Sequence, residues 1–304
     1  MEIIIPDFYV DLSPLERVHS SHLGTWGSVF RGEGYDLEGI RPYQHGDDAR
    51  KIARKASAHH GEVMVRVNYA ERNPTVFLVF DRSPKMGACD VFNPETEKWE
   101  SYKHKIMKVV SGAIINGAVK NHLTIGYIDF AKGEEHFRKP EEGDEGIARI
   151  RRSSSNENFL GDEDNVSECL ERLFTLKHNL PRGSLVFILS DFFVLPSEDL
   201  LGDAIDRFNL QPVIIRHPQW EMTFPQDSIT IPLRDATNGV VREIFITKSE
   251  ARRLHNQHEH NYQDAVAFFR SLGVDPLTFV SSDEEYCEEV FLEWADSRLR
   301  KGNR

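Results

Sequence analysis

The chain has 304 residues, 39% of them hydrophobic, and a formal net charge of −12 at pH 7. These values predict a globular protein with one large or two medium domains, and they argue against general binding to nucleic acid or anionic lipid unless a local basic patch reverses the charge. The longest apolar stretches are strand-sized, so we expect no membrane span. Three isolated cysteines and a start that lacks signal-peptide features predict a cytoplasmic protein without a disulfide framework or a structural zinc site.

The first 73 residues are rich in turns and crowded charges, which predicts an N-terminal lobe over residues 1–73. Within it, Asp47 or Asp48 can cap a helix that runs to about Ala58. Gly61 can end this helix before a short strand, Val63–Val67.

From residue 74 onward, apolar runs of strand length alternate with helical segments, which predicts a second domain over residues 74–304. Such alternation is typical of a mostly parallel sheet with helices on both faces, here with about five parallel strands and a polar insertion around residues 220–247. The predicted strands are Thr75–Phe80, Leu123–Phe130, Ser184–Ser190, Pro212–Arg216 and Leu277–Ser281. The predicted helices are Tyr102–Lys120, Val166–Asn179, Ser197–Asn209, Lys248–Leu272 and Glu284–Arg300. The stretch "RRSSSNENFLGDEDN" has no period and predicts a loop above the sheet.

Acidic residues stand at or near the carboxyl ends of three predicted strands: Asp81, Asp129 and Asp191. Open α/β sheets place their sites at this edge. Oxygen ligands that converge from separate loops suit Mg²⁺ or Mn²⁺. The alternative is that each aspartate only caps the turn or helix that follows it.

The stretch "FDRSPKMG", followed by a serine-bearing loop and by "ILSD", resembles a von Willebrand factor A-type domain. The metal-ion-dependent adhesion site of that family reads Asp-x-Ser-x-Ser, then a loop threonine, then a distal aspartate. The resemblance places Asp81 and Ser83 on the first two positions and Asp191 on the distal acid. One of three serines can stand for the threonine: Ser153, Ser154 or Ser155.

Lys85 stands where the motif has its second hydroxyl group. At ~4 Å from a dication and an effective dielectric constant of ~20, its ammonium group would be repelled by roughly 8 kcal/mol. Either Lys85 turns into solvent and Asp81, Ser83 and Asp191 hold Mg²⁺, or Lys85 lies among the acids as a counter-ion and no cofactor is needed. We favour the metal-free arrangement. Both leave an exposed, charged crown of Asp81, Ser83, Lys85 and Asp191 that an acidic side chain of a partner can engage.

The segment "GEGYDLEGIRPYQHGDDARKIARKASAHHGEVMVRVNYAERN" resembles the signature of the bacterial family called domain of unknown function 58. Tyr35, Ala53, Arg54 and His59 depart from that signature, but its Gly-Asp-Asp-x-Arg block is intact. This block is interpreted as a structural hinge between the two lobes, with a binding role for Arg41, Arg50, Arg54 and Lys55 as the alternative. The matching positions are Arg41, Tyr43, Gly46, Asp47, Asp48, Arg50, Ile52, Lys55 and Ala58.

The family resemblance implies a non-enzymatic role, since such proteins are encoded beside AAA+ ATPases of the MoxR type and act with them on other protein complexes. We therefore expect an adaptor that docks a MoxR-type ATPase and client proteins through the crown. The alternative is a magnesium-dependent phosphoester hydrolase with Asp81, Asp129 and Asp191 as metal ligands, although no general base is evident.

Overall fold

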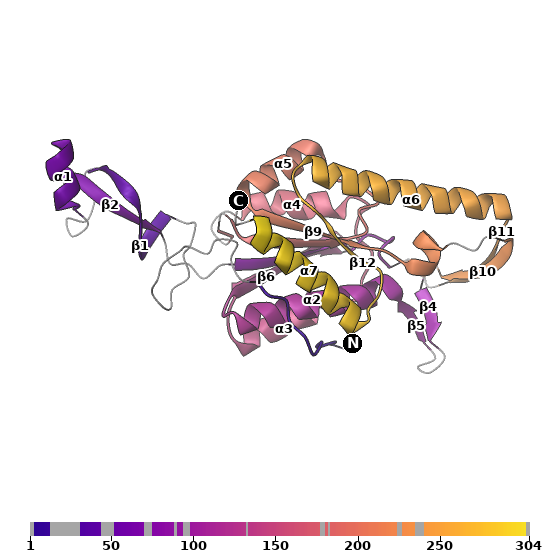
Figure 1. Cartoon of the computed structure of the whole chain (residues 1–304). Helices are drawn as coiled ribbons and strands as arrows, with labels where there is room; N and C mark the ends of the chain where they lie inside the picture. Colours follow the sequence, from indigo (N-terminus) through magenta and orange to yellow (C-terminus); the bar gives the residue numbers. More distant parts are fainter. Residues whose placement is uncertain are drawn as a thin grey trace. The chain divides into compact units, whose positions relative to one another are not determined.

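The chain divides into two compact units, Met1–Leu12 with Thr75–Ser297, and Ser13–Pro74 with Arg298–Arg304. Figure 1 shows the computed structural model. The structure describes residues 3–12, 31–43, 52–69, 75–87, 90–93, 98–131, 133–176, 180–181, 183–223, 227–234 and 240–301.

The smaller unit contains the antiparallel strands β1 (Arg31–Pro42) and β2 (Met64–Tyr69) and the helix α1 (Arg54–His60). Gly61, with φ of 73°, ends α1 as predicted. The predicted caps, Asp47 and Asp48, lie outside the described residues, and α1 itself begins after Ala53. Just before α1, Ile52 forms an isolated β-bridge to Val65.

The larger unit is built on a six-stranded sheet in the order β12-β9-β8-β3-β6-β7. The first five strands of this order are parallel, as predicted, and β7 is an antiparallel edge strand that was not predicted. In chain order along the sheet this is 3-2-1-4-5-6, so the topological switch point lies between β3 and β8. The strands are β3 (Thr75–Phe80), β6 (Thr124–Ala131), β7 (Glu134–Glu141), β8 (Leu185–Ser190), β9 (Asn209–Ile215) and β12 (Leu277–Phe279).

Helices cover both faces of the sheet, as Figure 1 shows. One face carries α2 (Tyr102–Lys120), α3 (Asp144–Ser154) and α7 (Glu284–Lys301), and the other carries α4 (Asn165–Thr175), α5 (Glu198–Arg207) and α6 (Lys248–Ser271). Each face buries its own apolar cluster, which explains why the strands are almost continuously hydrophobic. In the described part of the chain, no helix has both the length and the apolar character that a bilayer span requires.

Short elements are added at the carboxyl edge of the sheet. They are the hairpin of β4 (Asp90–Asn93) and β5 (Lys98–Ser101), the turn of π-helix η2 (Pro218–Met222), and the hairpin of β10 (Ile229–Arg234) and β11 (Val241–Ile246). The last two form the predicted insertion after β9.

Helix α3 replaces the start of the predicted loop at residues 151–165, since it runs through Ser154. Asp144 and Glu145 in its first turn and Arg151 and Arg152 in its last turn complement the helix dipole. Its apolar face is too short to produce a clear period in the sequence.

Residues 3–12 pack on α2 of the larger unit, whereas the predicted boundary assigns them to the N-terminal lobe. The amide of Asn116 donates to the carbonyls of Pro6 and Phe8 at 2.8 and 2.9 Å. A Cβ atom at Gly117 would collide with the carbonyl oxygen of Val10. Glycine at this position therefore lets the segment lie directly on the helix.

We predict that Gly117→Ala lowers the free energy of unfolding by about 1–3 kcal/mol, because the segment must shift away from α2. Gly202→Ala in α5 is the matched control. A Cβ atom there meets nothing within 4 Å, so the change should stabilise by about 0.5–1 kcal/mol. Chemical denaturation measures both, and equal effects would contradict the packing of residues 3–12.

Candidate functional site

Two of the predicted site residues, Asp81 and Asp191, meet at the switch point of the sheet. β3 and β8 are parallel neighbours with Phe80 opposite Leu189, and the backbone N–H of Asp81 donates to the Leu189 carbonyl at 3.0 Å. Asp81 follows β3 directly and Asp191 follows β8 directly. Because neighbouring strands lie about 4.8 Å apart, the two acids lie side by side.

The carboxylate of Asp81 is buried, and each of its oxygens accepts a hydrogen bond. One oxygen accepts the backbone N–H of Ser83 at 2.7 Å, and the other accepts the hydroxyl of Ser190 at 2.5 Å. Burial, and next the negative charge of Asp191, raise the pKa of Asp81 to about 6, against the lowering effect of these hydrogen bonds. Asp81 is thus an acid that gives up its proton near neutral pH.

The position of Asp191 is set by a strained turn. Its Oδ1 accepts the backbone N–H of Phe193 at 3.0 Å, and the residue between them, Phe192, has φ of 49°. A left-handed conformation at a non-glycine residue costs on the order of 1–3 kcal/mol. Burial of the Phe192 ring against Phe269, with ring centroids 4.8 Å apart, offsets that cost.

Lys103 provides the positive charge at this site. Its ammonium group donates to Oδ2 of Asp191 at 2.7 Å and forms an ion pair with Glu221 of η2, while its side chain is 4% exposed. Burial disfavours the charged amine, but the two carboxylates raise the pKa of Lys103 above its ordinary value, so it stays protonated. Lys103 lies in the first turn of α2, where the helix dipole repels a cation, and these carboxylates compensate for that too.

The prediction that Lys85 is the counter-ion of Asp81 and Asp191 is wrong. The Lys85 ammonium group lies 3.8 Å from Glu163 and 3.8 Å from the centre of the Phe193 ring, and its side chain is 33% exposed. Lys103, in the first turn of α2, takes the role predicted for Lys85 because it forms the ion pair with Asp191.

The predicted crown is also less exposed than expected. Asp81 and Ser83 are buried, and the Asp191 side chain is 8% exposed. Lys85 alone of these four residues presents a large part of its side chain to solvent. We call Asp81, Ser83, Lys85, Lys103, Asp191 and Glu221 together the rim.

The donors at the rim do not fit a divalent cation. The ammonium group of Lys103 contacts Asp191 directly, and both oxygens of Asp81 already accept hydrogen bonds. Among the described residues, no group of three or more His, Cys, Asp or Glu side chains is arranged to hold a metal ion.

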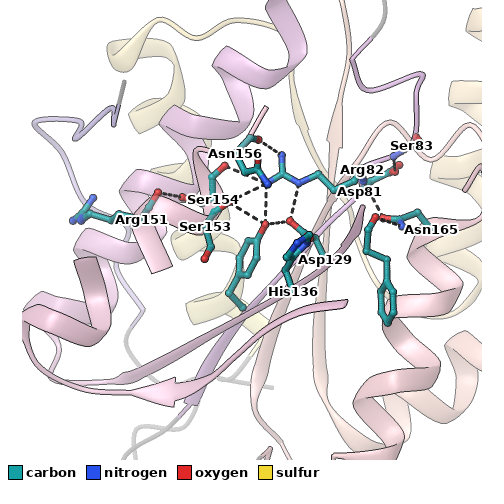
Figure 2. Close-up of polar contacts among 12 residues, drawn as sticks. Asp81, Arg82, Ser83, Asp129, His136, Arg151, Ser153, Ser154, Asn156 and Asn165 are labelled. Carbon is teal, nitrogen blue, oxygen red and sulfur yellow. Dashed lines mark hydrogen bonds and ion pairs between the residues drawn. The ribbon is translucent and has the colours of Figure 1, made fainter. Parts of the chain in front are cut away.

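Asp129 has a set of polar partners of its own, as Figure 2 shows. It lies inside β6, where its carboxylate accepts from Nε of Arg82 at 2.9 Å, from the Tyr127 hydroxyl and from Nδ1 of His136 at 2.7 Å. The predicted roles of Asp129, as a turn cap or as a ligand beside Asp81 and Asp191, are therefore wrong. Its carboxylate compensates a buried arginine.

Arg82, which is 0% exposed, ties the rim to the loop after α3. Its guanidinium group donates to the carbonyls of Asn156 at 2.6 Å and Ser153 at 3.2 Å (Figure 2), and its backbone N–H donates to Asn165 at 2.9 Å. Sequence reasoning missed Arg82, although it lies within the quoted motif. The available signal was an arginine two residues after a buried strand, next to Asp81.

Ser153, Ser154 and Ser155, the predicted equivalents of the motif threonine, form hydrogen bonds within and next to α3. The hydroxyls of Ser154 and Ser155 both donate back to the Arg151 carbonyl at 2.9 Å. The carbonyl groups of Ser153 and Ser154, and not their hydroxyls, contact Arg82.

The family-signature residues lie in or next to the smaller unit, and several fall outside the described residues: Gly46, Asp47, Asp48 and Arg50. Arg41 lies in β1 and Lys55 in α1, and Tyr43 is exposed. The hinge and binding interpretations of this block both remain predictions.

A family model described as "Protein of unknown function DUF58" matches residues 39–265. No curated protein matches the chain. Among solved structures, an aerotolerance-related membrane protein from Bacteroides fragilis, with multiple mutations to serines, is 16% identical. That match has a TM-score of 0.30 and covers 66% of this chain and 98% of the other. The PilB minor pilin from Streptococcus sanguinis is 10% identical with a TM-score of 0.37, covering 80% of this chain and 66% of the pilin. Both TM-scores are low, so neither structure adds an argument about fold or function.

We predict that Asp81 makes the stability of the protein fall as pH rises. Its folded pKa of about 6 lies above the ordinary 3.8, so the folded state binds its proton more tightly. Stability is lost between about pH 4 and pH 7, by about 3 kcal/mol at most. Asp81→Asn removes this component, so the stability of wild type minus that of the variant should fall across this range.

Urea denaturation over this pH range measures the difference, and Asp296→Asn, at an exposed position on α7, is the control. A difference in stability between wild type and Asp81→Asn that does not change with pH would contradict the raised pKa.

Proposed function

This chain belongs to the DUF58 family of proteins of unknown function, and we propose that it is a non-enzymatic protein-interaction adaptor that acts with a MoxR-type AAA+ ATPase in the assembly or maturation of protein complexes. In this proposal the larger unit is a von Willebrand A-type domain whose rim docks the partner. The choice of ATPase rests on the family resemblance. Aspartates at the ends of the first and fourth sheet strands, on the two sides of the switch point, support the domain type.

The observation that carries the proposal is the internal charge compensation of the rim. Lys103 forms ion pairs with Asp191 and Glu221, so a side chain of the protein itself neutralises part of the buried acidic cluster. Lys85 is partly exposed, and its ammonium group lies over the Phe193 ring. An acidic side chain of a partner can pair with Lys85 while an apolar group contacts that ring.

The hairpin β10–β11 adds apolar surface at the same edge of the sheet. It directly follows η2, which supplies Glu221 to Lys103. Phe245 is 63% exposed, and exposed apolar groups that gather in one region mark sites of protein interaction. The other exposed apolar residues of this hairpin and its flanks are Met222, Ile229, Val240, Val241 and Ile244.

No specific observation favours the alternative, a magnesium-dependent phosphoester hydrolase. Its three proposed ligands are divided between two clusters, since Asp129 pairs with Arg82 and Asp191 pairs with Lys103. The two described cysteines also offer no thiolate nucleophile. Burial raises the pKa of Cys169 well above its ordinary value and that of Cys287 to about 12, which keeps both thiols protonated.

We predict that Lys85→Glu weakens binding to the MoxR-type ATPase of the same genome by about tenfold or more, because it replaces attraction of an acidic group by repulsion. Phe245→Ser should also weaken binding, through lost apolar contact. Surface plasmon resonance with the purified ATPase measures both dissociation constants.

Lys120→Glu is the matched control. Lys120, which is exposed, also places its ammonium group over an aromatic ring, that of Tyr9 at 3.5 Å, but it ends α2 at the opposite edge of the sheet. Equal losses in Lys85→Glu and Lys120→Glu would assign the effect to net charge and reject the rim. Release of phosphate from a phosphoester that depends on Asp191 would reject the non-enzymatic role.

A further inference from the structure

We propose that a second site, distinct from the rim, binds a small molecule that carries a doubly charged oxyanion such as a phosphate group. The site is a pocket of about 330 Å³ between β7 and α3. Its walls carry four basic side chains: His136 and Arg138 from β7, and Arg149 and Arg152 from α3.

The pocket lining is predominantly basic, whereas the chain as a whole has a net charge of −12. Its acid, Asp129, is compensated by Arg82 at 2.9 Å, and Arg149 is paired with Glu141 at 2.5 Å. In the part of the chain that the structure describes, Arg138 and Arg152 form no ion pair. Two guanidinium charges therefore remain available to an anion from solvent.

His136 contributes an imidazole ring of fixed orientation to the pocket wall. Figure 2 shows its ring against Asp129, which engages Nδ1 at 2.7 Å. The hydrogen bond fixes the ring orientation and leaves Nε2 for another partner. Because a third of the His136 side chain is exposed to solvent in the pocket, Nε2 is accessible to a ligand.

The donor set selects a phosphate group. Guanidinium groups present paired N–H donors that match two oxygens of a phosphate, and charge-assisted hydrogen bonds of this kind are the strong ones. The volume of the pocket lies at the lower end of the range of small-molecule sites and exceeds that of a bare phosphate ion. We therefore assign the site to a small phosphate ester, with the free ion as the minimal ligand.

The test uses the full chain, with inorganic phosphate and glycerol 3-phosphate as probes in calorimetric titrations. We expect saturable binding of both, and a loss of about tenfold in affinity in Arg152→Gln and in Arg138→Gln. Both residues are exposed, so both variants should fold. Arg172→Gln is the control, since Arg172 is an arginine on the opposite face, in α4, and is paired with Glu135.

The imidazole NMR signals of His136 give an independent readout. They should shift on addition of either probe in wild type, and should not shift in the Arg138→Gln, Arg152→Gln double variant. Tighter binding of the ester than of phosphate assigns the site to an ester, and equal binding assigns it to the shared oxyanion. Absence of saturable binding, equal losses in Arg172→Gln, or tighter binding of a polyglutamate peptide would overturn the proposal.

Discussion

The ion pairs of Lys103 are the constraint on which the carboxyl edge of the sheet depends. One ammonium group joins α2 to the loop after β8 through Asp191 and to η2 through Glu221. Removing one member of a buried pair leaves an uncompensated charge, which typically costs about 3–5 kcal/mol. One cation cannot compensate three buried carboxyl groups, and this explains why the pKa of Asp81 is raised in the presence of Asp191.

Arg82 is another buried cation at this edge of the sheet, and it compensates Asp129 on β6. Its side chain reaches from the end of β3 to Asp129 on β6 and to the carbonyls of Ser153, in the last turn of α3, and Asn156, just after α3 (Figure 2). The consecutive residues 81 and 82 therefore belong to two different charge clusters. We propose a different binding function for each of the two charge clusters. In this proposal the rim with Lys103 binds a protein partner, while Asp129 belongs to the wall of a basic pocket.

The sequence predicts the sheet well because its strands are buried on both faces and form continuous apolar runs, as in Thr75–Phe80. The same pattern does not predict β7, because this edge strand, "EEHFRKPE", is polar on both faces and contains no continuous apolar run. The meeting of Asp81 and Asp191 follows from parallel strands, but the choice of counter-ion does not. Lys103 lies two residues into a helix and its partner Glu221 lies in the insertion, so only the packed structure shows that Lys103, and not Lys85, compensates the acids.

Titration with Mn²⁺, monitored by the electron paramagnetic resonance signal of the free ion, tests the role of Lys103 most directly. If Lys103 is the fixed cation of the rim, wild type binds no Mn²⁺ there. Lys103→Met then binds at least about tenfold more tightly, because Asp191 and Glu221 lose their positive charge. Tight Mn²⁺ binding by wild type that disappears in Asp191→Asn would contradict a metal-independent rim.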